Sequence, residues 1–166
     1  MFKYLLLLGG KMDYTHIVIK LETGDVKIKL RPDLAPNHVK QITELAEEGF
    51  YDGIVFHRVI PDFMAQTGDP TGTGTGSSDK PNLKQEFSAE KHTRGTASMA
   101  RSSDPNSANS QFFICFNDAN WLDGQYTIWG EVVEGMDLID GLKKGLDQSG
   151  MVTDPDKMLK VTPIKE

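Results

Sequence analysis

Cysteine is nearly missing from this chain of 166 residues, which contains Cys115 and no other thiol. A single cysteine excludes an intramolecular disulfide and favours a reducing compartment. Positive charge is also in deficit, because 18 Lys and Arg against 24 Asp and Glu give a formal net charge of −6. An acidic chain of ordinary composition is a poor candidate for binding nucleic acid or an anionic membrane surface. We therefore expect a cytoplasmic protein with neither kind of partner.

Long apolar segments are absent too. The opening residues, MFKYLLLLGGKM, imitate a secretory signal, but their apolar run ends at Leu8 and no A-x-A-like cleavage site precedes Lys11. The run is also far short of the ~20 apolar residues that span a bilayer. We expect residues 1–12 to be a disordered extension, translated upstream of a natural start at Met12, and residues 13–166 to form one domain. A periplasmic location would follow only if the extension acted as a signal.

The usual catalytic and metal-binding patterns are missing as well. The histidines, His16, His38, His57 and His92, lie far apart in the sequence and lack metal-ligand spacing. No G-x-S-x-G nucleophile elbow occurs. A nucleophilic pair of Cys115 with a distant histidine stays open, although a buried, inert cysteine is the commoner case. His57 has apolar neighbours and is interpreted as a hydrogen-bonded structural histidine rather than a base. No metal and no cofactor are expected.

The glycine-rich segment PTGTGTGSSDKPN (70–82) lacks what a phosphate-binding loop needs. Its three glycines stand at alternate positions, but no G-K-[ST] follows them. No helix begins there whose N-terminus could hold a phosphate. We therefore interpret residues 70–82 as a mobile surface loop.

Alternating apolar residues are the main pattern that is present. Two such runs in residues 15–31 flank a Glu-Thr-Gly-Asp turn and predict a β-hairpin. Pro36 opens a helical pattern that Gly49 ends, and a second helix is expected near 134–143. Further strand-like runs lie at 53–59, 63–67, 96–100, 110–116 and 126–133 and around Leu159 and Val161. Short strands with only two helices favour an antiparallel barrel or sandwich over a parallel sheet.

Two segments combine aromatic, apolar and amide side chains without an acid–base pair. FHRVIPDFMAQTGD (56–69) contains a single arginine, Arg58, beside soft apolar side chains. In SQFFICF (110–116), strand geometry would point Phe113 to the face opposite the core. There it could line a peptide-binding surface, or belong to a second small apolar cluster under a loop.

A third segment, NDANWLDGQYTIWG (117–130), places Trp121 on a loop just ahead of an Asp-Gly turn. A large aromatic residue in such a loop is often a recognition element. It can also be no more than a lid on the core, and the segment alone does not decide between the two.

Together with SMA (98–100), these segments resemble the signature regions of cyclophilin-type peptidyl-prolyl cis–trans isomerases, in order, from about residue 14 to 164. The resemblance implies a mainly β fold, a closed eight-stranded antiparallel β-barrel capped by two α-helices. It also implies isomerisation of X–Pro peptide bonds, which assists protein folding. Proline-containing peptides and unfolded or folding proteins would be the partners. Trp121 leads us to expect cyclosporin-like cyclic peptides as further ligands, and nothing in the sequence suggests more than a monomer.

The resemblance also assigns roles to single residues. The catalytic arginine of the family corresponds to Arg58, which would act with Gln66 and Phe63. The residues that match substrate-binding positions are Met64, Ala100, Gln111, Phe113, Trp121, Leu122 and Tyr126. Among them, the proline ring would lie on Met64, Phe113 and Leu122, together with Phe63.

Some positions depart from the best-known members of the family. Tyr126 stands where many eukaryotic cyclophilins have histidine, and Arg101 stands where they have asparagine. The segment SSDPNS (102–107) is one residue longer than the common eukaryotic version, and the 70–87 loop is shorter. These features resemble bacterial members, and they leave substrate preference and inhibitor affinity open.

Prolyl isomerisation suits a site with one cation and no nucleophile. Rotation about X–Pro requires only that the amide lose its double-bond character, against a barrier of about 20 kcal/mol. Arg58 could donate to the prolyl nitrogen in the twisted state, where the nitrogen lone pair becomes available. Two other functions stay open: a non-catalytic proline-peptide binding module, which has no need of Arg58 or Gln66, and a thiol hydrolase built on Cys115.

Overall fold

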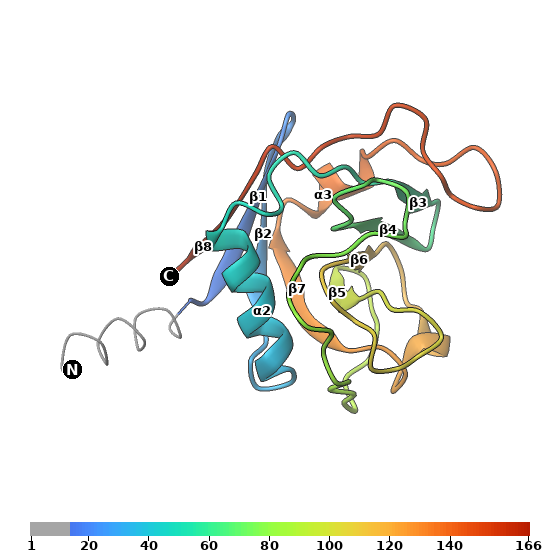
Figure 1. The fold of residues 1–166 in the computed structure, drawn as a ribbon. Coiled ribbons are helices and arrows are strands. Elements are labelled where there is room, and N and C mark those ends of the chain that lie inside the picture. Colours follow the sequence, from blue (N-terminus) through green and yellow to red (C-terminus); the bar gives the residue numbers. More distant parts are fainter. Residues whose placement is uncertain (1–13) are drawn as a thin grey trace.

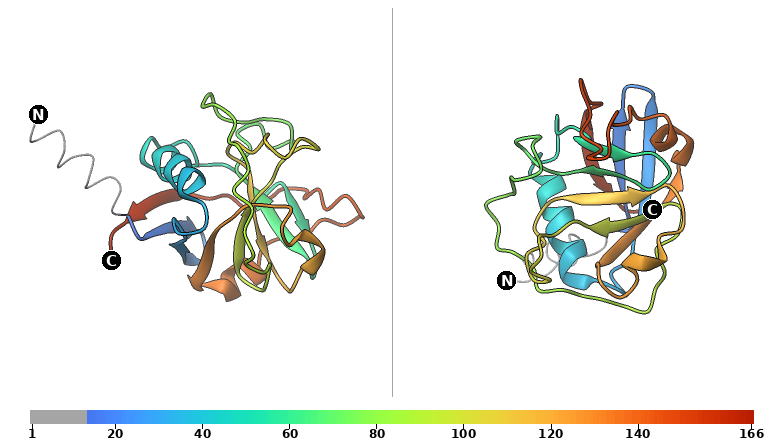
Figure 2. Two further views of the ribbon diagram at one scale, coloured as in Figure 1. Left: turned by 90° about the horizontal axis from the view of Figure 1, so that it is seen from below. Right: turned by 90° about the vertical axis from the view of Figure 1, so that its right-hand side faces the viewer.

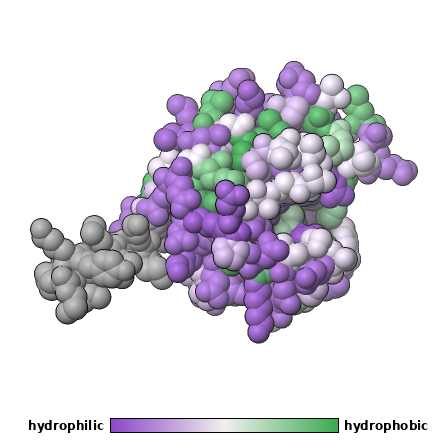
Figure 3. All heavy atoms as spheres, viewed as in Figure 1, coloured by the Kyte–Doolittle hydropathy of each residue, from purple (hydrophilic) through white to green (hydrophobic). Residues whose placement is uncertain are grey.

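The structure is a computed structural model, and it describes residues 14–166 of the chain. The extension expected at residues 1–12 lies outside the described residues. Within the described part, no helix combines the length and the apolar character needed to cross a membrane. On the face shown in Figure 3, apolar residues are scattered among hydrophilic ones.

The sheet begins with the predicted hairpin. β1 (His16–Leu21) and β2 (Gly24–Leu30) pair antiparallel, and Leu21 lies opposite Gly24 at the closed end. Alternate residues of both strands are buried, whereas the residues between them, Val18 included, are half-buried or exposed. The buried residues are Ile17, Ile19, Leu21, Val26, Ile28 and Leu30. Because successive side chains of a strand point to opposite faces, this alternation turns one face of the hairpin toward the core.

Further strands extend the hairpin into a single curled sheet (Figures 1 and 2). They are β3 (Arg58–Ile60), β4 (Met64–Thr67), β5 (Thr96–Met99), β6 (Phe112–Cys115), β7 (Ile128–Glu134) and β8 (Lys160–Ile164). Over residues 14–166 the sheet has eight strands in the order β3-β4-β6-β5-β7-β2-β1-β8. All neighbours pair antiparallel, which confirms the mainly β, eight-stranded antiparallel fold.

The barrel closes less regularly than predicted. β3 and β8 are the outer strands, and no ladder joins them in the described part of the chain. The segments beside them meet instead through isolated bridges, Val55 with Lys157 and Arg58 with Met151. The β3 edge is therefore covered by a loop near residue 150, and the side chain of Arg58 stays half-buried rather than enclosed.

Two α-helices pack on the sheet. α2 (Pro36–Glu47) lies against β8 and β7, and Gly49 follows it with a positive φ of 77°, as a helix stop requires. α3 (Met136–Asp140) lies against β2 and is shorter than the helix expected near 134–143. Gly135 precedes it at φ 86°, where a Cβ atom would lie only 2.5 Å from the Asp25 carbonyl oxygen. The chain must therefore leave β7 at a glycine before α3 can begin.

The buried apolar residues form two clusters, and β6 contributes to both. Phe112 and Ile114 belong to the larger cluster, the barrel core. Phe113 and Cys115 point to the other face and join a smaller cluster. Its buried members are Met64, Phe113, Cys115, Ala119 and Leu122. The alternation predicted for SQFFICF is thus confirmed, and the smaller cluster forms the floor of the site described next.

Candidate active site

The register of β3 against β4 sets the position of Arg58. Arg58 lies directly opposite Gln66, and Gln66 in turn lies opposite Phe113 on β6. The Arg58 Nη1 donates to Gln66 Oε1 at 3.1 Å, and its Nε donates to the Ser149 carbonyl at 3.0 Å. An arginine side chain has five N–H groups. The two bonds to protein acceptors hold the guanidinium in place and leave its other N–H groups for a ligand.

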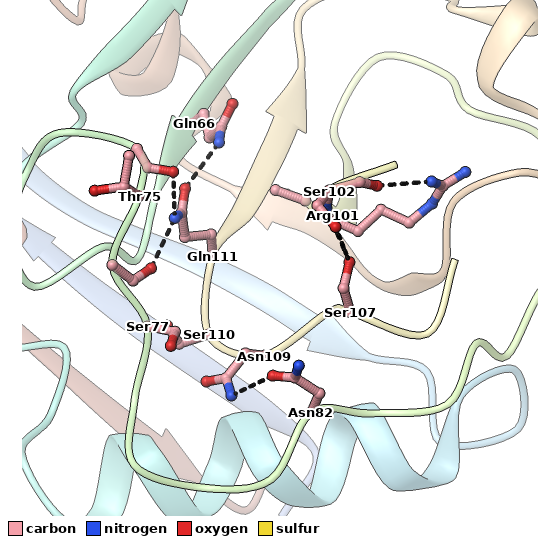
Figure 4. A pocket seen from close by; sticks show the side chains of 13 residues that line it. Gln66, Thr75, Ser77, Asn82, Arg101, Ser102, Ser107, Asn109, Ser110 and Gln111 are labelled. Atoms are coloured by element: carbon pink, nitrogen blue, oxygen red, sulfur yellow. Dashed lines mark hydrogen bonds between the residues drawn. The ribbon is translucent and has the colours of Figure 1, made fainter. Parts of the chain in front are cut away.

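A chain of hydrogen bonds fixes the orientation of the Gln66 amide (Figure 4). Gln111 Nε2 donates to the carbonyl oxygens of Gly74, at 3.1 Å, and Gly76, at 2.9 Å. Because carbonyls only accept, the Gln111 Oε1 must face the other way, and it accepts from Gln66 Nε2 at 2.9 Å. Gln66 is then left with its Oε1 toward Arg58. Both amides are thereby held in one orientation, and the guanidinium lies at the end of the chain.

Asp69 holds the loop that supplies those carbonyls. Its buried carboxylate accepts the backbone N–H groups of Thr71 (2.7 Å), Thr73 (3.2 Å), Gly74 (2.6 Å) and Gly76 (3.1 Å). Burial would raise the pKa of Asp69, but these hydrogen bonds outweigh burial and lower the pKa to about 2. A Cβ atom at Gly76 would lie 2.2 Å from the carboxylate. The alternating glycines thus let the backbone wrap an aspartate rather than a phosphate.

Replacing Asp69 by asparagine is expected to lower the free energy of unfolding by about 1–3 kcal/mol at pH 7. The pKa of Asp69 is depressed in the folded protein, so its contribution is complete above the unfolded value of about 3.9 and is lost as pH falls toward about 2. Urea unfolding of both proteins from pH 7 to pH 2 would show the difference shrinking. The exposed Asp79→Asn is the matched control, and an equal loss in both variants would contradict the assignment.

A cavity of about 340 Å³, lined mainly by apolar and aromatic side chains, adjoins Arg58. All of the predicted site residues except Gln111 line it; they are Arg58, Phe63, Met64, Gln66, Ala100, Phe113, Trp121, Leu122 and Tyr126. Gln111 lines a neighbouring polar pocket, which shares Gln66 with the first. The structure therefore brings all of the predicted site residues together in two adjoining pockets. It also adds Arg101 to both linings.

Phe63 reaches the cavity through a left-handed residue in the β3–β4 turn. Asp62 has a φ of 64°, and the Phe63 N–H closes the turn on the Ile60 carbonyl at 3.1 Å. The Phe63 ring then lies 5.4 Å from that of Trp121, centroid to centroid. Trp121 is 57% exposed and belongs to a 3-10 turn, η1 (Asn120–Leu122), at the rim. Strand alternation alone does not predict this position of Phe63.

A buried hydrogen-bond chain supports the cavity from behind. His92 Nδ1 lies 3.0 Å from Asp123 Oδ1, and its Nε2 lies 2.9 Å from the Ser98 hydroxyl. The imidazole also stacks on the Phe113 ring, with 6.2 Å between centroids. The arrangement has the residue types of a hydrolase triad, but Ser98 is fully buried and also bonds the Thr127 carbonyl. It acts as a brace between the floor of the cavity and the loop that carries Trp121.

Neither Cys115 nor His57 provides a nucleophile or a base. Cys115 is buried, and burial raises the pKa of its thiol to about 12. His57 is buried as well, and burial lowers the pKa of its imidazole. Neither ring nitrogen of His57 has a protein hydrogen-bond partner among residues 14–166, so His57 is buried as expected of a structural histidine, but the expected hydrogen bonds are not found within the protein. No group of three or more metal-ligating side chains gathers in this part of the chain.

The fold and this site define a barrel with a cyclophilin-like groove, and comparisons with known proteins agree. The structure superposes on a cyclophilin-type peptidyl-prolyl cis–trans isomerase from Cryptosporidium parvum, solved in the presence of the dipeptide Ala-Pro. The TM-score is 0.84 at 30% identity, covering 91% of this chain and 99% of that one. A cyclophilin from Hirschia baltica superposes with a TM-score of 0.81 at 28% identity, covering 91% of this chain and 74% of that one.

Sequence comparison gives the same family. Residues 16–163 match the family described as cyclophilin type peptidyl-prolyl cis-trans isomerase/CLD. A probable peptidyl-prolyl cis-trans isomerase from Brucella suis is 54% identical over 158 residues, covering 88% of this chain and 81% of that protein. The isomerase ppi1 of Schizosaccharomyces pombe is 39% identical over 158 residues, covering 90% of this chain and 99% of that protein. The chain belongs to the cyclophilin-type peptidyl-prolyl cis–trans isomerase family.

Proposed function

We propose that the protein accelerates rotation about X–Pro peptide bonds without a covalent intermediate, and that it assists protein folding in this way. The observation that carries the proposal is the position of one guanidinium, Arg58, at the edge of a cavity lined by apolar side chains. The proline ring lies on Phe63, Met64, Phe113 and Leu122. The free N–H groups of Arg58 then donate to the prolyl nitrogen.

The donation by Arg58 is stronger in the transition state than in the ground state. In a planar amide the nitrogen lone pair is delocalised, and it becomes an acceptor only as the bond twists. An interaction of this kind accelerates the reaction rather than merely binding the substrate. A guanidinium stays protonated in proteins and donates without transferring a proton. The apolar walls keep water away and so strengthen the electrostatic interaction.

Gln66 has two roles in the proposed mechanism. Its Oε1 accepts from Arg58 and holds the guanidinium toward the cavity. Its amide also lies on the cavity wall, where it can hold a neighbouring peptide group while the other side of the X–Pro bond rotates. Lowering the barrier by about 7–8 kcal/mol would give a rate enhancement on the order of 10⁵–10⁶. In the proposed mechanism, the directed donation by Arg58 beside apolar side chains supplies an effect of this size.

The proposal is tested by isomerase activity on a panel of peptides that differ in the residue before proline. A binding module would bind these peptides without accelerating exchange, and it would not need the Arg58–Gln66 pair. A thiol hydrolase would lose its activity when its cysteine is alkylated. Because Cys115 is buried and has no role in the proposed mechanism, we expect thiol reagents to leave the isomerase activity unchanged. Absence of catalysed exchange on every peptide would refute the proposal.

Cyclosporin-like cyclic peptides are proposed as ligands of the same groove. Trp121 is exposed at its rim, and Tyr126 packs edge-on against Phe113 with 5.9 Å between centroids. Binding is expected to change tryptophan fluorescence and to raise the melting temperature through mass action. A titration that changes neither signal at about 50 µM ligand, where even a weak complex is populated, would contradict the proposal.

A further inference from the structure

The groove is bordered by two guanidinium groups and by no carboxylate. Arg58 and Arg101 both line the apolar cavity. Arg101 also lines the neighbouring polar pocket of about 280 Å³, which is drawn in Figure 4, so it belongs to the linings of both pockets. Among the described residues, no aspartate or glutamate lines either pocket. The groove is thus locally positive on a chain whose formal net charge is −6.

The guanidinium of Arg101 is held in place by neutral groups. Its Nε and Nη2 donate to the Gln125 carbonyl, at 3.1 and 2.8 Å, and its Nη1 donates to the Ser102 carbonyl at 2.9 Å. Its central carbon lies 4.5 Å from the Tyr126 ring centroid, in cation–π contact. Three of the five N–H groups are therefore used, and two remain.

Pinning the loops around residues 102 and 125 is one role for Arg101, but it does not account for the missing counter-ion. Within residues 14–166, Arg31 and Arg94 form ion pairs with carboxylates, whereas the two arginines that line the groove, Arg58 and Arg101, form none. A preorganised guanidinium with free N–H groups matches a carboxylate better than it matches a neutral group. The rest of the polar pocket presents hydroxyl, amide and glycine backbone groups, which do not repel an anion.

We propose that Arg101 is a specificity-determining residue that favours substrates with an aspartate or glutamate one or two positions from the proline. With the ring in the apolar cavity, the neighbouring residues of the peptide pass the boundary of the two pockets, and an acidic side chain reaches Arg101. The inference rests on the proposed function, because it assigns a substrate class to the same groove.

The test uses peptides that vary one position at a time, within two residues of the proline on either side. The varied position carries glutamate, glutamine or lysine. For the wild-type protein, kcat/KM is expected to be roughly three- to tenfold higher with glutamate than with glutamine at one of these positions. Lysine there should lower it below glutamine. The difference should arise mainly in KM, and it should shrink between low salt and about 0.5 M salt.

Variants separate the charge of Arg101 from its role in packing. Arg101→Gln should bring the glutamate-to-glutamine ratio to about one, and Arg101→Lys, which keeps the charge, should retain part of the preference. Lys40→Gln, which removes an exposed charge on α2, should leave the ratio unchanged. A merely structural Arg101 would alter activity on all peptides equally and would leave the ratio as it is.

Two outcomes distinguish this inference from the proposed function. If glutamine peptides are isomerised but glutamate gives no gain at any position, or the gain survives in Arg101→Gln, the inference is overturned and the function stands. If no peptide is isomerised, the function fails. In that case the inference is decided by the dissociation constants of the glutamate and glutamine peptides, measured by tryptophan fluorescence. Equal dissociation constants, or no binding at all, overturn the inference.

Discussion

Replacing Arg58 by alanine is expected to lower kcat/KM for X–Pro isomerisation by roughly 100- to 1000-fold, because in the proposed mechanism it removes the directed donor to the twisted amide. Most of the loss should appear in kcat, since the donation strengthens only in the transition state. Stability should change little, because the side chain is half-buried and, within residues 14–166, forms hydrogen bonds only with Gln66 and the Ser149 carbonyl. Peptide isomerisation kinetics and urea unfolding measure the two effects.

Arg58→Lys serves as the graded variant in the same experiment. Lysine keeps a positive charge, but it lacks the planar guanidinium, which can donate to Gln66 and to a ligand in the cavity at the same time. An activity between those of alanine and wild type is expected. Turnover by Arg58→Ala close to that of wild type, with an intact fold, would show that the role given to Arg58 is wrong.

Replacing Phe113 by alanine is expected to affect both activity and stability. The ring is 4% exposed and forms the floor of the cavity, with Tyr126 on its edge and His92 stacked behind it. Truncating a buried phenylalanine lowers stability by about 3–5 kcal/mol. Without the floor the proline ring loses its apolar contact, so kcat/KM should fall more than tenfold, about 1.4 kcal/mol or more. Circular dichroism and peptide kinetics at low temperature provide the measurements.

The matched control for Phe113 is Phe50→Ala. Phe50 is half-buried, packs on Tyr51 at a centroid distance of 5.2 Å and lies on the barrel core, away from the groove. It should lower stability and leave kcat/KM unchanged. An activity loss in Phe113→Ala no larger than that of Phe50→Ala would mean that the floor of the cavity does not hold substrate.

Local periodicity predicted the parts of the fold that depend on neighbours in the sequence. The hairpin, the helix that begins at Pro36 and the opposed faces of Phe112 and Phe113 all follow from it, and the structure confirms each of them. The eight-stranded arrangement itself came from the family resemblance, since strand order is set by long-range pairing that periodicity does not encode. For the same reason, the irregular closure between β3 and β8 was not predicted.

The parts of the site that were missed depend on contacts between distant segments. Gln66 and Gln111 are 45 positions apart. Which of the two amides donates the hydrogen bond between them is set by a third segment, through the carbonyls of Gly74 and Gly76. Residues 70–82 were interpreted as a mobile loop, yet Asp69 holds the first half of that segment through its backbone N–H groups. An aspartate followed by glycines at alternate positions was the available signal, because such glycines let backbone N–H groups converge on an anion.

The same applies to the brace behind the cavity. His92, Ser98 and Asp123 are unremarkable in the sequence and become linked only when β5 and the loop after η1 come together. Their spacing gave no signal. The roles assigned to the site residues, the cytoplasmic location and the monomeric state stay predictions.

In the mechanism we propose, Arg58 acts on the twisted amide rather than on substrate binding. NMR exchange spectroscopy on a saturating X–Pro peptide measures cis–trans exchange in the bound state, and a titration on the same samples gives the dissociation constant. We expect Arg58→Ala to bind the peptide within about a few-fold of wild type, while exchange of the bound peptide falls by about 100-fold or more. Exchange that continues at the wild-type rate in the bound Arg58→Ala complex would contradict this mechanism.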